Sequence, residues 1–163
     1  MRVLGLDPGT ATTGYGIIDA VGDDYHLVAY GVITTAAGDP APARLQSIYR
    51  QLSRLLSDHQ PESAGVEQLY FGRNITTAIA VGQARGVLLL ALADAGLPVG
   101  EYSPPTVKES VTGLGNADKA QVQLMVRQLL HLEETPRPDD AADALAVAMT
   151  HARHALFRAA YEE

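Results

Sequence analysis

The order of strand-like and helical segments limits the folds open to this chain more than any other feature. Three strand-like segments come first, and each later one follows a helical segment. Apolar runs bounded by turn residues predict strands at residues 2–7, 14–20, 25–34, 63–69 and 99–103. Apolar residues at helical spacing predict helices over residues 43–59, 76–95, 105–111 and 118–130, and from about 138 towards the C-terminus.

This order predicts an α/β fold built on one mixed sheet. The first three strands form an antiparallel meander, and short right-handed connections place the strand at 63–69 parallel to the first strand and beside it. The result is a five-stranded mixed sheet with helices on both faces. A length of 163 residues, of which 47% are hydrophobic, predicts a single domain over residues 1–163.

Composition excludes several classes of protein. The chain has no cysteine, which excludes a disulfide framework, a thiolate metal site and a cysteine nucleophile. The longest apolar run, Gly86 to Ala93, is shorter than the roughly 18 residues of a membrane span. Asp7 interrupts the N-terminal apolar stretch where a signal peptide would continue. We therefore expect a soluble, cytoplasmic protein.

Charge is unevenly distributed along the chain. The net charge of −7 argues against indiscriminate binding to nucleic acid. Residues 73–127, however, carry five basic and four acidic residues and include both lysines of the chain, Lys108 and Lys119. A local basic surface beside acidic clusters is therefore compatible with the composition.

Four acidic residues lie where the predicted fold would gather them. Asp7 and Glu67 come at or near the ends of two apolar strands in the sheet centre, and ligand sites collect at the carboxyl ends of such strands. Asp140 and Asp143 are one helical turn apart, so both point to one face of the last helix. The two alanines between them keep this helix slim enough to lie close to the sheet.

These carboxylates predict a metal-dependent phosphodiesterase. Each alone also has a structural explanation, since Asp7 precedes a Pro-Gly turn and Asp140 lies at a helix start. Together, in a buried site, they would repel one another strongly. A hard divalent cation resolves this repulsion, and Mg²⁺ or Mn²⁺ suits oxygen ligands. Two such ions about 3.5–4 Å apart would activate a water and stabilise the leaving oxygen of a phosphodiester.

A series of motifs gives the chain a resemblance to a known family. The motifs are Leu4-Gly5-Leu6-Asp7-Pro8-Gly9-Thr10, Tyr15-Gly16, Val66-Glu67-Gln68, Gly82-Gln83-Ala84-Arg85-Gly86 and the DAADALA run from Asp140 to Ala146. In this order and spacing, from residue 3 to about 151, the chain resembles the RuvC family of bacterial crossover (Holliday) junction endodeoxyribonucleases. The resemblance implies a ribonuclease-H-like fold.

The resemblance also implies an activity and partners. A homodimer would bind a four-way DNA junction during recombination and DNA repair. It would nick two strands of like polarity symmetrically, leaving 5′-phosphate and 3′-hydroxyl ends. Asp7, Glu67, Asp140 and Asp143 would be the catalytic, metal-binding carboxylates, whereas Asp139, one residue before the matching position, would cap its helix. The branch-migration proteins RuvA and RuvB are expected partners.

DNA-contacting positions follow from the same resemblance. Lys108 and Lys119 match basic positions beside the active site, and Lys119 would reach the scissile phosphate as a catalytic residue. Its place in the first turn of a helix, where the helix dipole disfavours a cation, favours a functional role. An aromatic residue after the Glu67 strand would stack on an unpaired base; position favours Tyr70, and Phe71 stays open as the alternative.

Four further residues have weaker assignments. Arg73, Asn74 and Arg85 are candidate phosphate contacts, although the stem of Arg85 could equally extend along its own helix. His151 follows Asp143 by about two helical turns and is expected behind the carboxylates or at the surface.

The helix at 76–95 is apolar on more than one face, which predicts burial on two sides. One side would pack on the sheet and the other on a second copy of the chain, because Ala78, Gly82 and Gly86 allow close approach.

Three alternative functions remain at this point. Asp7-Pro8-Gly9-Thr10 also resembles the phosphate turn of actin-like ATPases and sugar kinases, which duplicate the domain and are longer. A smaller nuclease of the YqgF type shares an early Asp-Pro-Gly, but the aromatic loop and the Gly82–Gly86 motif argue against it. A catalytically dead junction-binding protein is disfavoured by four intact carboxylates.

Overall fold

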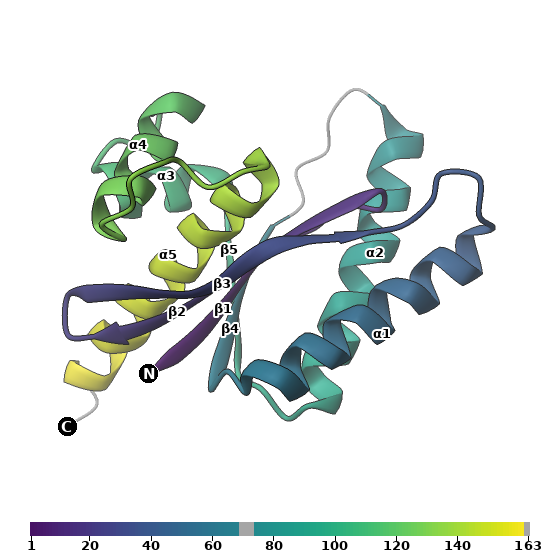
Figure 1. Cartoon of the computed structure of the whole chain (residues 1–163), viewed down its shortest axis with the longest axis horizontal. Coiled ribbons are helices and arrows are strands. Elements are labelled where there is room, and N and C mark those ends of the chain that lie inside the picture. Colours follow the sequence, from purple (N-terminus) through teal and green to yellow (C-terminus); the bar gives the residue numbers. More distant parts are fainter. Residues whose placement is uncertain (69–73, 162–163) are drawn as a thin grey trace.

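The computed structural model describes residues 1–68 and 74–161. One sheet has the strand order β3-β2-β1-β4-β5, with bounds β1 Arg2–Asp7, β2 Thr12–Val21, β3 Asp24–Thr34, β4 Ser63–Glu67 and β5 Val99–Tyr102. The helices are α1 Ala41–His59, α2 Ile75–Asp94, α3 Pro104–Thr112, α4 Lys119–Leu129 and α5 Asp139–Tyr161. α1 and α2 cover one face of the sheet, and α3, α4 and α5 lie on the other side (Figure 1).

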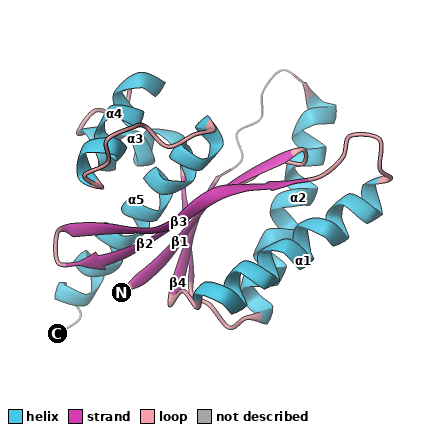
Figure 2. Ribbon diagram, in the orientation of Figure 1, coloured by secondary structure: helices cyan, strands magenta, loops and turns pink. Residues whose placement is uncertain are grey.

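The predicted mixed sheet is confirmed. β1 pairs antiparallel with β2, which continues into β3 through a tight turn at Gly22 and Asp23 (Figure 2). β1 pairs in parallel with β4, and β4 pairs in parallel with β5. Gly22 has a φ of 59°, a left-handed conformation that glycine adopts without steric cost.

Alternation along β1 and β4 divides the core in two. Leu4, Leu6 and Val66 pack on the side of α1 and α2. Val3 packs on the opposite side, among residues of α3, α4 and α5. Because successive side chains of a strand point to opposite faces, the last residues of these strands, Asp7 and Glu67, fall on the α5 side.

Glycines in the sheet bring α5 close to the strands. A Cβ added at Gly14 would overlap the carbonyl oxygen of Asp140, and one added at Gly5 would overlap the carbonyl oxygen of Ala144. On the helix side, Ala141 and Ala142 are fully buried. The expectation that alanines let this helix lie close to the sheet is therefore confirmed.

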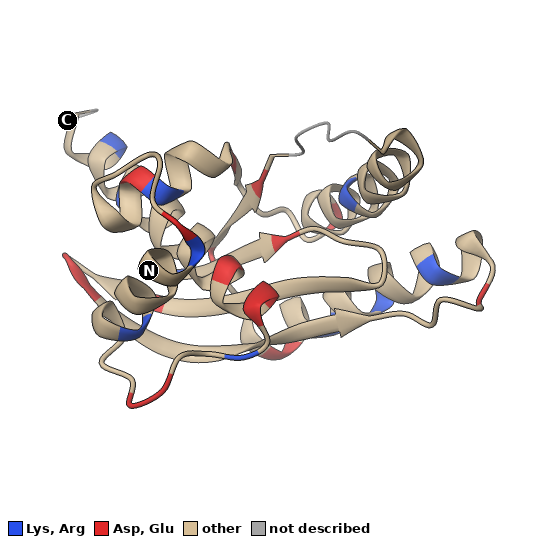
Figure 3. Ribbon diagram, turned by 90° about the horizontal axis from the view of Figure 1, so that it is seen from above, with Lys and Arg blue, Asp and Glu red and all other residues tan. Residues whose placement is uncertain are grey.

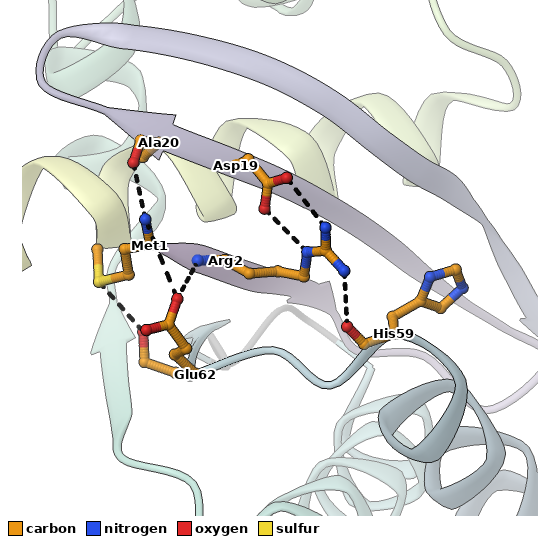
Figure 4. Close-up of polar contacts among 7 residues, drawn as sticks. Met1, Arg2, Asp19, Ala20, His59 and Glu62 are labelled. Carbon is orange, nitrogen blue, oxygen red and sulfur yellow. Dashed lines mark hydrogen bonds and ion pairs between the residues drawn. The ribbon is translucent and has the colours of Figure 1, made fainter.

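The N-terminal end of the sheet is tied together by Arg2 (Figure 4). Its guanidinium donates from Nε and Nη2 to the two carboxylate oxygens of Asp19, at 2.8 and 3.0 Å. Nη1 donates to the carbonyl oxygen of His59 at the end of α1, at 3.0 Å. One side chain thus joins β1, β2 and α1. It lies at the end of the sheet opposite the strand ends that carry Asp7 and Glu67.

His151 is a core residue of α5, so of the two positions expected for it, behind the carboxylates or at the surface, the surface position is wrong. It is 3% exposed, and its Nδ1 lies 2.8 Å from the hydroxyl oxygen of Tyr102 on β5. Gly65 and Gly100 leave the space that its ring occupies above β4 and β5. Burial, with the nearby charges of Arg158 and His154, lowers the pKa of His151 to about 4.

α2 buries one face and exposes another apolar face. The side chains that face the core are Ala78, Ala84, Leu88, Ala91 and Leu92. Ile75, Ile79 and Leu90 are 74%, 57% and 54% exposed. By length and composition, α2 is the one helix of the described residues that could cross a membrane, a property that core helices of soluble proteins share. The longest uninterrupted apolar run, Gly86–Ala93, covers less than half of this apolar helix. The apolar segment is therefore longer than that run alone indicates.

We expect Gly14→Ala to lower the free energy of unfolding by about 1–3 kcal/mol, because the new methyl group forces α5 away from β2. Gly38→Ala is the matched control, since its Cβ would meet nothing within 4 Å. Urea unfolding of both variants measures the difference. Equal stability of the two variants would show that the α5 contact is not tight.

The buried His151 predicts loss of stability in mild acid. Its ordinary pKa of 6.5 falls to about 4 on folding, so the unfolded chain binds the proton first. Acidification from pH 6.5 to pH 4 therefore removes about 3 kcal/mol of stability through this residue. The measurement is urea unfolding against pH for the wild type and His151→Gln, and identical slopes in this window would contradict the assignment.

Candidate active site

Two carboxyl groups meet at the ends of β1 and β4. Leu6 and Val66 are register partners in the parallel ladder, so the next residues, Asp7 and Glu67, lie side by side. A hydrogen bond joins their carboxyl groups. Burial, followed by the charges of Glu67, Asp143 and Asp140, raises the pKa of Asp7 to about 8. Burial also raises the pKa of Glu67, although the hydrogen bond from Asp7 opposes it.

α5 brings two more carboxylates to this point. Its first turn passes over Gly14, which is the register partner of Asp7 on β2. The charges of Asp140 and Asp143 both act on Asp7 across this contact. Seen from above in Figure 3, acidic positions mark strand ends and a neighbouring helix. The four predicted carboxylates are thus gathered at one end of the sheet.

The two lysines of the chain face the carboxylates in one pocket. The pocket has a volume of about 230 Å³ and is lined by Glu67, Asp143, Lys108 and Lys119. Lys108 comes from α3 and Lys119 from α4. Apolar side chains complete the lining, namely Pro104, Val107, Val122 and Ala146. Both lysines therefore lie beside the carboxylates, as the resemblance implies.

A capping box sets the position of Lys119. The Asp118 side chain accepts from the backbone N–H of Gln121, and the Gln121 side chain accepts from the backbone N–H of Asp118, each at 2.8 Å. Lys119 is therefore the first residue of α4, as the sequence predicts. Its Nζ lies 3.5 Å from Oδ2 of Asp143. Although partial burial acts against the charged form, Asp143 and Asp139 raise the pKa of Lys119.

Asp139 lies in the first turn of α5, where a capping role was expected. The hydrogen bonds to its Oδ1 come from side chains, Nε2 of Gln123 and Nη1 of Arg137, both at 3.1 Å. Its Oδ2 lies 3.5 Å from Nζ of Lys119. Although desolvation opposes the effect, Lys119 and Gln123 hold the pKa of Asp139 below its usual range. Sequence reasoning missed this network, and the only signal was the one-turn spacing of Lys119 and Gln123.

Two other residues predicted to contact DNA, Asn74 and Arg85, lie within the described part of the chain and do not line the pocket. Asn74 is the N-cap of α2, and its Oδ1 accepts from the backbone N–H of Thr77 at 3.2 Å. Arg85 pairs with Glu101 and donates from Nε to the carbonyl oxygen of Glu67 at 3.4 Å. Tyr70, Phe71 and Arg73 lie outside the described residues.

The donor chemistry of the site suits a hard divalent cation. Among residues 1–68 and 74–161, no three His, Asp or Glu side chains are arranged as a ready set of metal ligands. Burial nevertheless raises the pKa values of Asp7, Glu67 and Asp143, which shows that their negative charge is incompletely compensated by the protein. Oxygen ligands with uncompensated charge are what Mg²⁺ and Mn²⁺ bind.

In this mixed sheet the two adjacent central strands end in acidic residues, and the first turn of an acidic helix lies over them. This is the arrangement of a ribonuclease-H-like nuclease. The model of the family described as crossover junction endodeoxyribonuclease RuvC matches residues 3–151. The chain therefore belongs to the RuvC family, as its motifs indicate, and not to the ATPase-like or YqgF-type alternatives.

Individual relatives agree with this assignment. The chain is 56% identical to crossover junction endodeoxyribonuclease RuvC of Chloroflexus aggregans over 152 residues, which cover 93% of each chain. It is 50% identical to that of Brevibacillus brevis over 157 residues, covering 96% of this chain and 95% of the relative. Thermus thermophilus RuvC in complex with a Holliday junction substrate is 39% identical, with a TM-score of 0.92 over 97% of this chain and 96% of that one.

A more distant structure confirms the fold alone. The yeast mitochondrial Holliday junction resolvase is 17% identical, with a TM-score of 0.72 over 98% of this chain and 80% of that one. The predicted α/β, ribonuclease-H-like architecture is thus confirmed.

We expect Asp7→Asn to stabilise the metal-free protein by at least about 1 kcal/mol, or about 2–4 °C in Tm. Between its ordinary pKa of 3.8 and about 8, folded Asp7 holds a proton that the unfolded chain has lost. Stability of the wild type therefore falls as pH rises through this range. Thermal melts in EDTA should show a larger gain for Asp7→Asn at pH 8.5 than at pH 5. A gain independent of pH would contradict the raised pKa.

Proposed function

We propose that this chain resolves four-way DNA junctions by metal-dependent, symmetric nicking of two strands of like polarity. The products would carry 5′-phosphate and 3′-hydroxyl ends. The observation that carries the proposal is the gathering of Asp7, Glu67, Asp140 and Asp143 at one end of the sheet, with a lysine ammonium 3.5 Å from Asp143. The 39% identity to a protein solved with a Holliday junction substrate supports the choice of DNA.

The four carboxylates would hold two Mg²⁺ or Mn²⁺ ions per active site. A bound cation of this kind supplies charge neutralisation at the phosphate and an activated water. The protein itself positions the substrate. Lys119 would neutralise the scissile phosphate from one side of the pocket, and Lys108 would contact a phosphate from α3.

Further DNA contacts are proposed around the segment that follows Glu67. Tyr70 or Phe71 would stack on an unpaired base, and Arg73 and Asn74 would contact phosphates. Asn74 lies at the N-terminus of α2, where unsatisfied backbone N–H groups and the helix dipole favour an anion. Arg85 would reach a phosphate only by leaving Glu101, so its contribution should be the smallest of this group.

Cleavage of three DNA substrates tests the function. A mobile four-way junction, a linear duplex and a single strand are each incubated with EDTA, Mg²⁺ or Mn²⁺. We expect paired nicks at symmetric positions, only in the junction and only with metal. Junction binding without nicks in any metal would support a catalytically dead binding protein and contradict the proposal.

Asp7→Asn should abolish nicking, by at least about a thousandfold, and retain junction binding in EDTA, because it weakens the cation site and leaves the lysines in place. Asp39→Asn is the matched control, since Asp39 is an exposed acid in the connection between β3 and α1. Loss of junction binding in Asp7→Asn would assign Asp7 to structure and not to catalysis.

We also propose a homodimer that packs through the exposed apolar face of α2. Ile75, Ile79 and Leu90 on this face would otherwise remain in water. Two copies of the site would then nick the two strands symmetrically. Cooperation with RuvA and RuvB and a cytoplasmic location are proposed from the family resemblance.

A charge on this face should separate the dimer. We expect Ile79→Glu to elute as a monomer in size-exclusion chromatography with light scattering, because burial of the carboxylate in an apolar interface is costly. Leu124→Glu on α4 is the control, since Leu124 is 45% exposed on another surface. If the Ile79→Glu variant still elutes as a dimer, the interface does not lie on this face of α2.

A further inference from the structure

Lys119 has two carboxylate partners that differ in their surroundings. Oδ2 of Asp143 and Oδ2 of Asp139 each lie 3.5 Å from its Nζ. The Asp143 side chain is 29% exposed and lines the pocket with Glu67. The Asp139 side chain is 44% exposed and belongs to a separate network at the start of α5. Of these two partners, Asp143 lines the pocket and Asp139 does not, so Asp139 can hold Lys119 without occupying the site.

Asp139 is itself held from two further directions. Its Oδ1 accepts hydrogen bonds from Gln123 on α4 and from Arg137 in the segment before α5, both at 3.1 Å. Its Oδ2 is left to face Lys119. Gln123 follows Lys119 by one helical turn, so both side chains leave the same face of α4. These two hydrogen bonds hold the Asp139 carboxylate separately from its contact with the Lys119 ammonium group.

We infer that Asp139 is a positioning residue, whose carboxylate holds the Lys119 ammonium in the pocket that Lys119 lines together with Glu67 and Asp143. The inference rests on the proposed nuclease function and names one more residue of that site. A lysine side chain has four rotatable bonds and no preferred direction, so a fixed partner outside the pocket confines its ammonium group.

Stability does not account for this arrangement. Lys119 and Asp139 are 56% and 44% exposed, and an exposed ion pair contributes little to folding. A simple charge effect also predicts the opposite result, because removal of an acid near the DNA phosphates would tighten binding and speed nicking. A positioning role predicts that Asp139→Asn slows nicking while junction affinity holds.

The first test is a double-mutant cycle in single-turnover nicking of the junction. We expect Asp139→Asn to slow the nicking rate about 5–20-fold, with junction Kd changed less than about twofold. In the Lys119→Ala background, Asp139→Asn should change the rate less than about twofold, because its partner is gone. Glu134→Gln, an exposed acid before α5, is the control and should nick as fast as the wild type. Thermal melts confirm that each variant is folded.

The second test needs no activity. The chain has two lysines, so reductive ¹³C-methylation gives two side-chain NMR signals, assigned with Lys108→Arg and Lys119→Arg. We expect Asp139→Asn to move the Lys119 signal and to leave the Lys108 signal in place. Unchanged Lys119 signals, or nicking by Asp139→Asn at the wild-type rate, would overturn the inference. Failure of the wild type to nick any junction would instead overturn the proposed function, and the NMR result would still decide whether Asp139 holds Lys119.

Discussion

The close contact between α5 and the glycines of the sheet is the constraint on which the rest of the structure depends. Gly5 and Gly14 have no side chains on the face that α5 covers, and backbone carbonyl groups of the helix occupy the vacated space. This contact decides how near the first turn of α5 comes to the end of β1. The carboxylates on α5 meet those on the strands only because the backbones approach so closely.

The two halves of the core, one on each face of the sheet, have different roles. The side that holds α5, α3 and α4 supports the carboxylates and both lysines. The side that holds α1 and α2 is an aliphatic layer, with α2 presenting further apolar side chains outward. β1 belongs to both layers through simple alternation of its residues. A five-residue strand such as β4 can therefore carry a packing residue, Val66, directly beside an acid, Glu67.

Most of the fold follows from sequence patterns, since every predicted strand and helix is present with bounds shifted by at most a few residues. Asp7 and Glu67 were predictable because parallel strands place their carboxyl ends together. Two features were not predictable from local patterns. His151 lies in the core because Gly65 on β4 and Gly100 on β5 leave room for its ring, and its spacing from Asp143 along the helix does not indicate this. The partners of Asp139 depend on how α4 packs beside α5, which no single segment encodes.

The raised pKa of Asp7 has a consequence for folding itself. Up to about pH 8 the folded chain keeps on Asp7 a proton that the unfolded chain has lost, because burial disfavours the charged carboxylate. Through this residue, folding of the metal-free chain at neutral pH therefore takes up a proton from the solvent. Refolding in a weakly buffered solution would then make that solution more alkaline through Asp7.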